Sequence, residues 1–438
     1  MFLGNVAQET AKTDSNGRWI SVIIYSIALG RVTLGFLDRG FDLFWSDIAV
    51  FTAMVSYFIF DPKARKKFQT SGIEGFVAVY FLTILLSYPK ALDTYKYFAW
   101  VKICLFQLFV FYLGYNLTSS VNSIYRIGIS VLPMVSIIAI QSISNLISLA
   151  ATSSSIDKNA FSTEFGRNNY LASLFVIGIV FGIGFLYLKG INRFTRVSII
   201  FTVLFLVMSV FLASSRGGIV ASLAGAIFFW IFFNFFGQGV RNHSNLTLFI
   251  LPVTIVLLGA LVWLFAPESL KDDWFFRSTD GLIDSGNIKR LESWNFAWNS
   301  FLEQPFLGIG LSNQLTVQLN EIGVDSTTHN IFLQVLVELG ILGFSAFFGI
   351  LLYCAVTMSK YLNKLRIVDH NQRVLVAICM SIFAASMVNS LYEPSFWGPQ
   401  YAAIFWLILG SCVKAIRLQF YAKSEQISQA RQPGMSYD

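Results

Sequence analysis

The chain has 438 residues, of which 55% are hydrophobic and only 13% are charged, whereas soluble domains carry about 25% charged residues. This composition excludes an ordinary soluble domain and predicts a bundle of hydrophobic helices in a membrane. The net charge of +7 does not indicate nucleic acid as a partner, because the cations lie in turns between apolar runs and form no basic stripe.

Apolar runs recur along the chain and predict an all-α integral membrane protein. Because about 20 apolar residues cross the hydrocarbon core, we expect about twelve spans. They form one polytopic domain over residues 1–418, followed by a polar cytoplasmic tail at 419–438. The polar first residues contain no cleavable leader pattern, so the first span is expected to direct its own insertion. The expected spans are 19–37, 41–60, 73–89, 97–116, 127–151, 169–188, 196–214, 218–236, 246–265, 329–357, 374–392 and 397–416.

The distribution of Lys and Arg predicts how these spans are oriented. Cytoplasmic loops are enriched in both residues. If the N-terminus is inside, the inner segments contain far more Lys and Arg than the short outer loops. Both termini are therefore expected in the cytoplasm, and the long polar loop at 266–328, between the ninth and tenth spans, is expected outside. Connections of this length usually have a function.

Arginine stands at two of the expected outer turns. Arg167 precedes the sixth span, and Arg216 lies between the seventh and eighth spans, where two apolar runs meet. Ser214 or Ser215 can cap the following helix. Gly217 and Gly218 would let an anion approach backbone N–H groups at the positive helix end. The alternative is a tight turn with an arginine at the membrane interface.

Within the long loop, residues 288–304 predict an amphipathic helix that ends at Pro305. A tryptophan-rich stripe suits a helix lying at the level of lipid headgroups, and Arg290 at its start could then point towards a lipid phosphate. The alternative is a helix packed on the bundle with a solvated arginine. The apolar stripe consists of Leu291, Trp294, Trp298, Phe301 and Leu302.

His329 and Asn330 stand at the outer start of the tenth span. A helix N-terminus disfavours imidazolium, so His329 is expected to be neutral and able to accept a proton from a hydroxyl. The alternative is a histidine that merely caps the helix. Glu338, inside the same span, is a second candidate, as are Arg31 and Asp47, which could pair with each other. With one outer histidine and no outer cysteine, no zinc site is expected.

Four of these residues are far apart in sequence yet all reach the predicted outer face. Singly, an arginine at a membrane boundary more often extends to headgroups than binds a substrate. Several arginines on the side of the membrane where positive charge is disfavoured indicate an anion site. The four are Arg167, Arg216, Arg290 and His329.

A series of short motifs runs through this part of the chain in a fixed order. It begins with Gly166-Arg167-Asn168-Asn169, Ser215-Arg216-Gly217-Gly218 and Arg290-Leu291-x-x-Trp294, and continues with Pro305-x-x-Gly308-x-Gly310, His329-Asn330 and Glu338-x-Gly340. In order, spacing and shared face, the series resembles the O-antigen ligase and polymerase superfamily. The resemblance covers most of the chain in topology and residues 167–340 at motif level.

The resemblance implies a metal-independent glycosyltransferase without a cofactor, at the periplasmic face of a bacterial inner membrane. Its donor would be a glycan on undecaprenyl diphosphate. Arg216 and Arg290, with Arg167, would bind the diphosphate, and His329 would activate the acceptor hydroxyl or stabilise the site. The remaining site residues, which would shape it, are Ser215, Gly217, Gly218, Asn330 and Trp294.

Several alternatives stay open from the sequence. Glu338 or an acidic residue of the long loop could be the catalytic base. The acceptor could be lipid A–core (a ligase), another glycan (a polymerase) or a protein hydroxyl. From a different class, a polysaccharide-precursor transporter or flippase is less favoured, because transporters show repeats and broken helices, whereas these spans read as mostly continuous.

Overall fold

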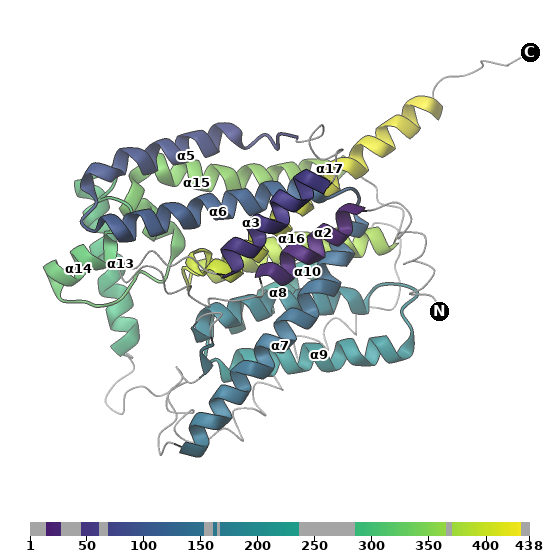
Figure 1. Ribbon diagram of the computed structural model, residues 1–438, viewed down its shortest axis with the longest axis horizontal. Helices are drawn as coiled ribbons and strands as arrows, with labels where there is room; N and C mark the ends of the chain where they lie inside the picture. Colours follow the sequence, from purple (N-terminus) through teal and green to yellow (C-terminus); the bar gives the residue numbers. More distant parts are fainter. Residues whose placement is uncertain are drawn as a thin grey trace, which may run out of the picture.

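The computed structural model describes residues 15–27, 45–60, 69–152, 161–163, 167–235, 285–364 and 370–430. Within these ranges every regular element is a helix (Figure 1), as the composition predicts. Eight of the described helices are long and apolar enough to cross a membrane. The chain is therefore a helical integral membrane protein.

The structure describes fifteen helical elements, two of which are 3-10 helices. In chain order they are α2 (Ser15–Ile27), α3 (Trp45–Phe60), α5 (Glu74–Ser87), η1 (Tyr88–Lys90), α6 (Thr94–Leu117), α7 (Asn122–Thr152), α8 (Asn168–Leu186), α9 (Arg193–Leu212), α10 (Arg216–Phe235), α13 (Ser285–Glu303), α14 (Gln314–Ile322), α15 (Ile331–Lys364), α16 (His370–Ser390), η3 (Ser395–Trp397) and α17 (Pro399–Ala430).

The expected spans and the observed helices differ at several places. Helix α5 has only 14 residues, because the chain changes to the 3-10 helix η1, which contains a proline in its first turn. Helices α2 and α3 are also short, with 13 and 16 residues. The expected span 246–265 lies outside the described residues. At the other end, α17 continues to Ala430, past the expected boundary at residue 418.

The core of the bundle is built around α8. All its residues from Leu171 to Phe185 are buried, as expected for a helix that is apolar on every side. Helices α6 and α17 pack closely at two glycines: a Cβ atom on Gly114 would overlap the Leu407 carbonyl, and one on Gly410 would overlap the Phe111 carbonyl. Small residues at such contacts let membrane helices approach one another.

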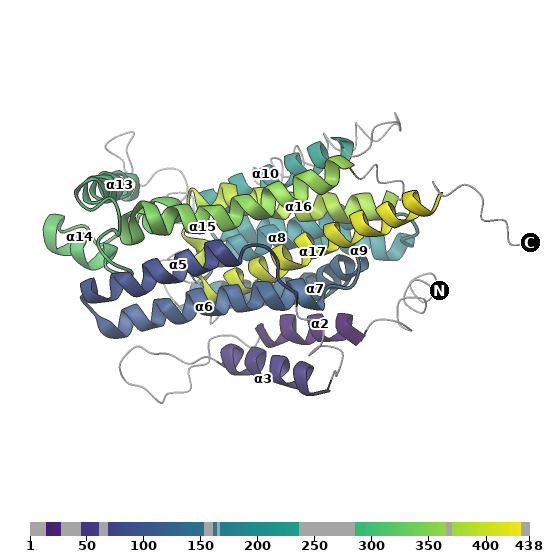
Figure 2. The ribbon, with the colours of Figure 1, turned by 90° about the horizontal axis from the view of Figure 1, so that it is seen from above.

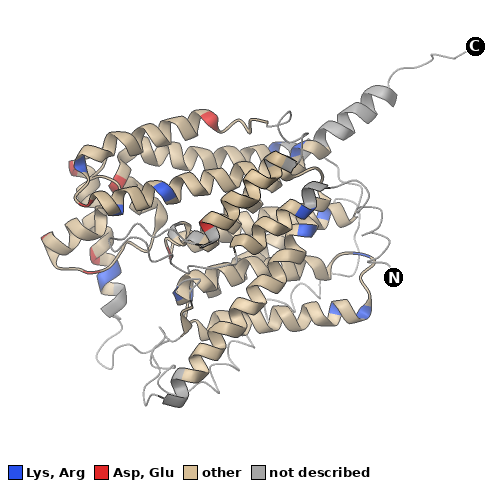
Figure 3. Ribbon diagram, viewed as in Figure 1, with Lys and Arg blue, Asp and Glu red and all other residues tan. Residues whose placement is uncertain are grey.

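Most helices lie roughly along one direction, with α13 and α14 outside the bundle at one end (Figures 1 and 2). We call this the site end; α8, α10 and α15 begin there and α16 ends there. The opposite end, where α10 and α15 end and α16 begins, is the far end. Charged residues gather mainly at these two ends (Figure 3).

One charged pair lies along the helices instead. The Asp47 carboxylate of α3 lies 3.0 Å from the Lys102 ammonium of α6. Asp47 thus pairs with α6. Arg31, the partner expected from the sequence, lies outside the described residues. The pair is partly buried, so each charge compensates the desolvation of the other.

Candidate functional site

His329 is placed by a helix cap. The Asn330 side-chain oxygen accepts hydrogen bonds from the N–H groups of Phe332 and Leu333 at 3.0 and 3.1 Å, which makes Asn330 the N-cap of α15. His329 therefore stands just outside the helix, with a φ of 49°. A positive φ is uncommon for residues other than glycine, and such strain concentrates at functional sites.

The His329 ring is bound by a carboxylate. Its Nδ1 atom lies 3.1 Å from Oε2 of Glu393, in the turn between α16 and η3, and the same oxygen accepts a hydrogen bond from Asn169 Nδ2 at 2.9 Å. A carboxylate accepts hydrogen bonds, so His329 Nδ1 is the donor in this contact, and in the corresponding tautomer Nε2 is the ring's acceptor. The His329 side chain is 25% exposed and that of Glu393 only 9%, so the ring is accessible and its partner is not.

A buried polar network fixes the turn that carries Glu393. Asn389 Nδ2 donates to Ser173 Oγ at 2.8 Å and to Ser395 Oγ at 2.7 Å. The two hydroxyls are themselves 2.8 Å apart. All three side chains are buried, and they join α8, α16 and η3. Glu393 is therefore held in one position relative to α8 and His329.

Arg216 begins α10 at the same end of the bundle. Ser215 Oγ accepts a hydrogen bond from the Gly218 N–H at 3.2 Å, so the predicted cap is confirmed. The glycines serve packing: a Cβ atom on Gly218 would lie 2.8 Å from Ala172 Cβ, and one on Gly217 would lie 3.0 Å from Tyr392 Cβ. Close packing against α8 and against the turn after α16 therefore accounts for both glycines. The Arg216 side chain is exposed at the positive end of α10.

Arg167 lies next to this turn. It is exposed and precedes the first residue of α8. The following residue, Asn168, is buried and donates to the Ala213 carbonyl at 3.0 Å. This bond connects the start of α8 to the turn between α9 and α10. Arg167 and Arg216 thus come from two segments that are tied together.

Helix α13 confirms the predicted helix in the long loop, but most of its apolar stripe stays exposed. The face that packs carries Ser293, Phe296, Ala297 and Ser300, all buried. Of the predicted stripe, Trp298 is 51% and Leu302 57% exposed. Three small side chains on the buried face, Ser293, Ala297 and Ser300, let α13 pack on α15, with Phe296 buried beside them.

Trp294 connects α13 to the histidine turn. Its Nε1 donates to the Thr328 carbonyl at 2.5 Å, directly before His329. Gln318 of α14 donates to the carbonyl of Ser326 at 2.7 Å, so the two loop helices together hold the segment that leads to His329. Arg290 precedes Trp294 by one helical turn and lies on the same face of α13. It is half-buried.

The motif Pro305-x-x-Gly308-x-Gly310 packs on a break in α15 at Gly340, where φ is 64° and ψ is −168°. The N–H groups of Ile309 and Gly310 donate to the carbonyls of Val337 and Glu338 at 2.9 and 3.0 Å, and the Ile341 N–H donates to Pro305 at 2.8 Å. The backbone groups freed by the break are thereby paired.

Glycine is required on both sides of this junction between segment 305–310 and α15. A Cβ atom on Gly308, whose φ is 65°, would overlap the Val337 carbonyl, and one on Gly340 would overlap the Phe306 carbonyl. Two of the predicted motifs, Pro305-x-x-Gly308-x-Gly310 and Glu338-x-Gly340, therefore meet as one backbone junction.

Glu338 lies away from His329. Nine residues of helix separate them, or roughly 13 Å along the axis at 1.5 Å per residue. The Glu338 side chain is buried, and its Oε1 accepts a hydrogen bond from Gln334 at 3.5 Å. The assignment of Glu338 as a catalytic residue stays a prediction.

Glu393 is not among the residues predicted from the sequence, and Asn169 is predicted only as part of the motif Gly166-Arg167-Asn168-Asn169. A signal was present, because Glu393 is an acidic residue before Pro394 in the short outer turn expected between the last two spans. That turn is predicted on the same face as His329. Because Glu393 is acidic, the number of Lys and Arg residues in the short outer turns does not reveal it.

Comparison with protein-family models matches residues 200–348 to the family described as O-Antigen ligase. The matched residues run from α9 into α15 and include Arg216, α13, the junction and His329. Asn169 and Glu393 lie outside them. A comparison with curated proteins finds no match.

Proposed function

We propose that this chain transfers a glycan from a lipid-linked donor to the hydroxyl group of an acceptor. The match of residues 200–348 to the O-antigen ligase family supports this proposal. The donor is a glycan on undecaprenyl diphosphate, and the reaction takes place at the periplasmic face of a bacterial inner membrane. The observation that carries the proposal is the accessible His329 ring, bound by Glu393 at the same end of the bundle as Arg216.

In the proposed reaction, His329 acts as the general base. Its Nε2 takes the proton of the acceptor hydroxyl while that oxygen forms a bond to the anomeric carbon of the donor sugar. The bond between this carbon and the diphosphate oxygen breaks, and its electron pair leaves with the lipid diphosphate. Glu393 keeps Nδ1 as the donor and stabilises the imidazolium that forms, as a carboxylate does in a catalytic triad.

The arginines bind the diphosphate in this proposal. Arg216 and Arg290, with Arg167, supply planar groups that can bind phosphate oxygens in a bidentate manner. Positive charge placed beforehand stabilises the charge that develops on the leaving group. The N-terminus of α10 adds a further positive potential beside Arg216.

In this proposal helix α13 contacts the membrane surface through its exposed apolar side chains. We propose that its exposed stripe, which includes Leu291, Trp298 and Leu302, lies at the level of the outer headgroups, where tryptophan is favoured. Trp294, on the same helix, contacts the histidine turn by donating a hydrogen bond to the Thr328 carbonyl. Insertion of the stripe and placement of His329 are then linked through one rigid helix.

The acceptor distinguishes ligase from polymerase. We propose a ligase-like reaction, with lipid A–core or a related surface glycolipid as acceptor. A polymerase of the same superfamily would use the same donor site and a second lipid-linked glycan. A transporter would need binding groups at its helix breaks, and the break at Gly340 leaves few, because its backbone groups pair with segment 305–310.

The proposal is tested with the purified protein in detergent, undecaprenyl-diphosphate-linked oligosaccharide and a panel of acceptors. We expect a product with lipid A–core, and its loss in Arg216→Ala. Arg193→Ala, which removes an exposed arginine at the far end, is the matched control and should keep full activity. Donor movement across proteoliposomes without product on any acceptor would replace the enzyme by a transporter.

A further inference from the structure

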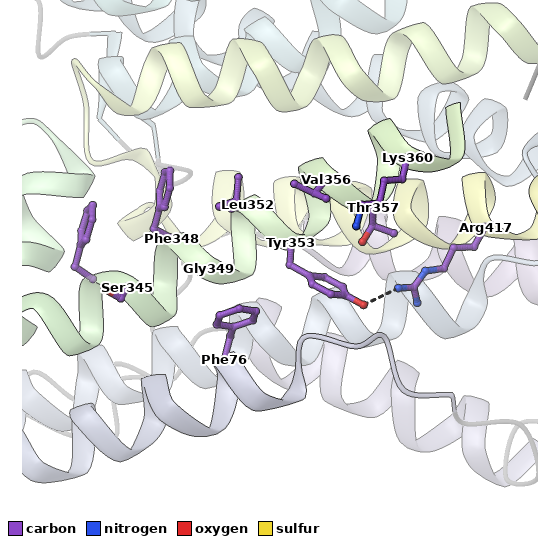
Figure 4. A pocket seen from close by; sticks show the side chains of 11 residues that line it. Phe76, Ser345, Phe348, Gly349, Leu352, Tyr353, Val356, Thr357, Lys360 and Arg417 are labelled. Carbon is purple, nitrogen blue, oxygen red and sulfur yellow. Dashed lines mark hydrogen bonds between the residues drawn. The ribbon is translucent and has the colours of Figure 1, made fainter. Parts of the chain in front are cut away.

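A groove of about 670 Å³ runs along the surface between α5 and α15 and reaches α17 at the far end (Figure 4). One stretch of it is apolar and the other carries two cations, Lys360 and Arg417. The apolar stretch is lined by Phe76, Phe344, Phe348, Leu352 and Val356.

The apolar walls face outward from the bundle. The Phe76 side chain is 39% exposed and that of Leu352 is 50% exposed. In a membrane-spanning bundle such an exposed apolar groove is open to lipid chains. Gly349 forms part of the floor, where a Cβ atom would lie 2.5 Å from the Phe76 ring, so the two helices approach each other closely below the groove.

Arg417 is positioned by two phenols. Its guanidinium donates to Tyr115 Oη at 2.8 Å and to Tyr353 Oη at 3.1 Å. A guanidinium has five N–H donors, and the buried Nε has no hydrogen-bond partner among the described residues. Lys360 is exposed at the same end of the groove. This end of the groove therefore presents two positive charges, those of Lys360 and Arg417.

Among the described residues, the nearby carboxylate of Glu74 makes its hydrogen bonds at the start of α5 and with α6, not with Lys360 or Arg417. Glu74 accepts hydrogen bonds from the N–H groups of Ser71 and Gly72 at 2.6 and 2.7 Å, and a third from Tyr112 Oη at 3.0 Å. Its oxygens are thus engaged at the start of α5. Lys414 adds another cation, 5.0 Å from the centre of the Tyr115 ring.

We propose that this groove binds an anionic phospholipid. Its acyl chain lies along Phe76, Phe348 and Leu352, and its phosphate meets Lys360 and Arg417. An apolar channel that ends in two cations matches an anionic headgroup with its chain, and basic pockets between membrane helices bind such headgroups. On the expected orientation this is the cytoplasmic leaflet.

The lipid site is separate from the proposed donor site. Lys360 lies 20 residues beyond the break at Gly340, or roughly 30 Å along the second part of α15 at 1.5 Å per residue, whereas His329 lies before the break. The proposal therefore stands on the groove alone and does not depend on glycan transfer.

The test is lipid binding to the full-length purified protein, measured by native mass spectrometry. Phosphatidylglycerol and phosphatidylcholine with identical acyl chains are titrated against it. We expect phosphatidylglycerol to be preferred, and Lys360→Gln to reduce its affinity about fivefold, as expected for one basic residue near an anionic headgroup. Lys189→Gln, an exposed lysine between α8 and α9 at the far end, is the matched control and should bind as the unaltered protein does.

A second variant tests the apolar part of the groove. Val356→Trp fills it without changing a charge, and it should weaken phosphatidylglycerol binding while the thermal unfolding temperature stays unchanged. Equal affinity for the two lipids, or equal losses in Lys360→Gln and Lys189→Gln, would overturn the proposal. Tighter binding of undecaprenyl phosphate than of phosphatidylglycerol would also overturn it, and would assign the groove to a polyprenyl chain.

Discussion

The histidine turn and the junction at Gly340 lie at the two ends of the same short stretch of α15, yet they are built differently. At the turn, side chains make the contacts: His329 meets Glu393, and Asn330 caps the helix. At the junction, backbone groups make them, between segment 305–310 and residues 337–342. The first arrangement holds an accessible side chain in place, and the second joins two segments of backbone.

This difference gives the two regions opposite experimental signatures. A side chain that protrudes from a fixed turn can be replaced with little cost in folding and a large cost in function. A glycine with a left-handed φ that touches another backbone cannot be replaced without strain. Measuring activity and stability together therefore separates them.

The largest effect is expected at His329. His329→Gln removes the base but keeps a polar side chain, so transfer should fall by about 10²–10⁴-fold, the contribution typical of general acid–base catalysis. The unfolding temperature should hardly change. Initial rates and thermal unfolding of the same preparation check both. An unaltered rate would remove His329 from the mechanism.

The next effect is expected at Glu393. Glu393→Ala leaves the ring without its carboxylate, and misplacement of a catalytic group by about 1 Å can cost about 10²-fold in rate. Glu393→Gln keeps an acceptor for Nδ1–H and should recover part of the rate. If Glu393→Ala and Glu393→Gln were equally impaired, transfer would require the negative charge of Glu393, and orientation of the His329 ring by a hydrogen bond would not be enough.

The junction should show the reverse signature. Gly340→Ala forces a Cβ atom into a left-handed residue that touches the Phe306 carbonyl, so the folded state should lose about 1–3 kcal/mol. Transfer per folded molecule should stay within a few-fold of normal. Thermal unfolding in detergent is the measurement. Gly75→Ala, where an added Cβ meets no neighbour within 4 Å, is the control.

The smallest effect is expected at Trp294. Trp294→Phe keeps an aromatic ring but removes the donor to the Thr328 carbonyl, a hydrogen bond worth about 1 kcal/mol. Transfer should fall only a few-fold. Trp298→Phe, on the same helix but with its side chain 51% exposed, should be normal in detergent. Equal losses in both would mean that the helix acts through its apolar surface and not through Trp294.

Hydropathy and charge placement predicted much of this molecule. The all-helical membrane class, the helix in the long loop, the cap at Ser215 and the common end for Arg167, Arg216 and His329 are confirmed. Each depends on local composition or on the order of the spans. Local composition is visible within a window of about 20 residues, which is the length of one membrane span.

What could not be predicted depends on contacts between distant residues. Glu393 is 64 residues from His329, and periodicity says nothing about which turn faces which. Another face of α13, with Ser293, Phe296 and Ala297, packs on the bundle in place of the predicted stripe, and the pattern of large side chains does not reveal this. The break at Gly340 was missed because the apolar run continues through it.

The central claim is that the His329 side chain serves the reaction whereas the Glu338–Gly340 segment serves the fold. The most direct test compares glycan transfer by His329→Gln and Glu338→Gln, each normalised to the amount of folded protein. The account predicts that transfer is lost in His329→Gln and retained in Glu338→Gln. Retained transfer in His329→Gln with loss in Glu338→Gln would contradict it and make Glu338 the catalytic base.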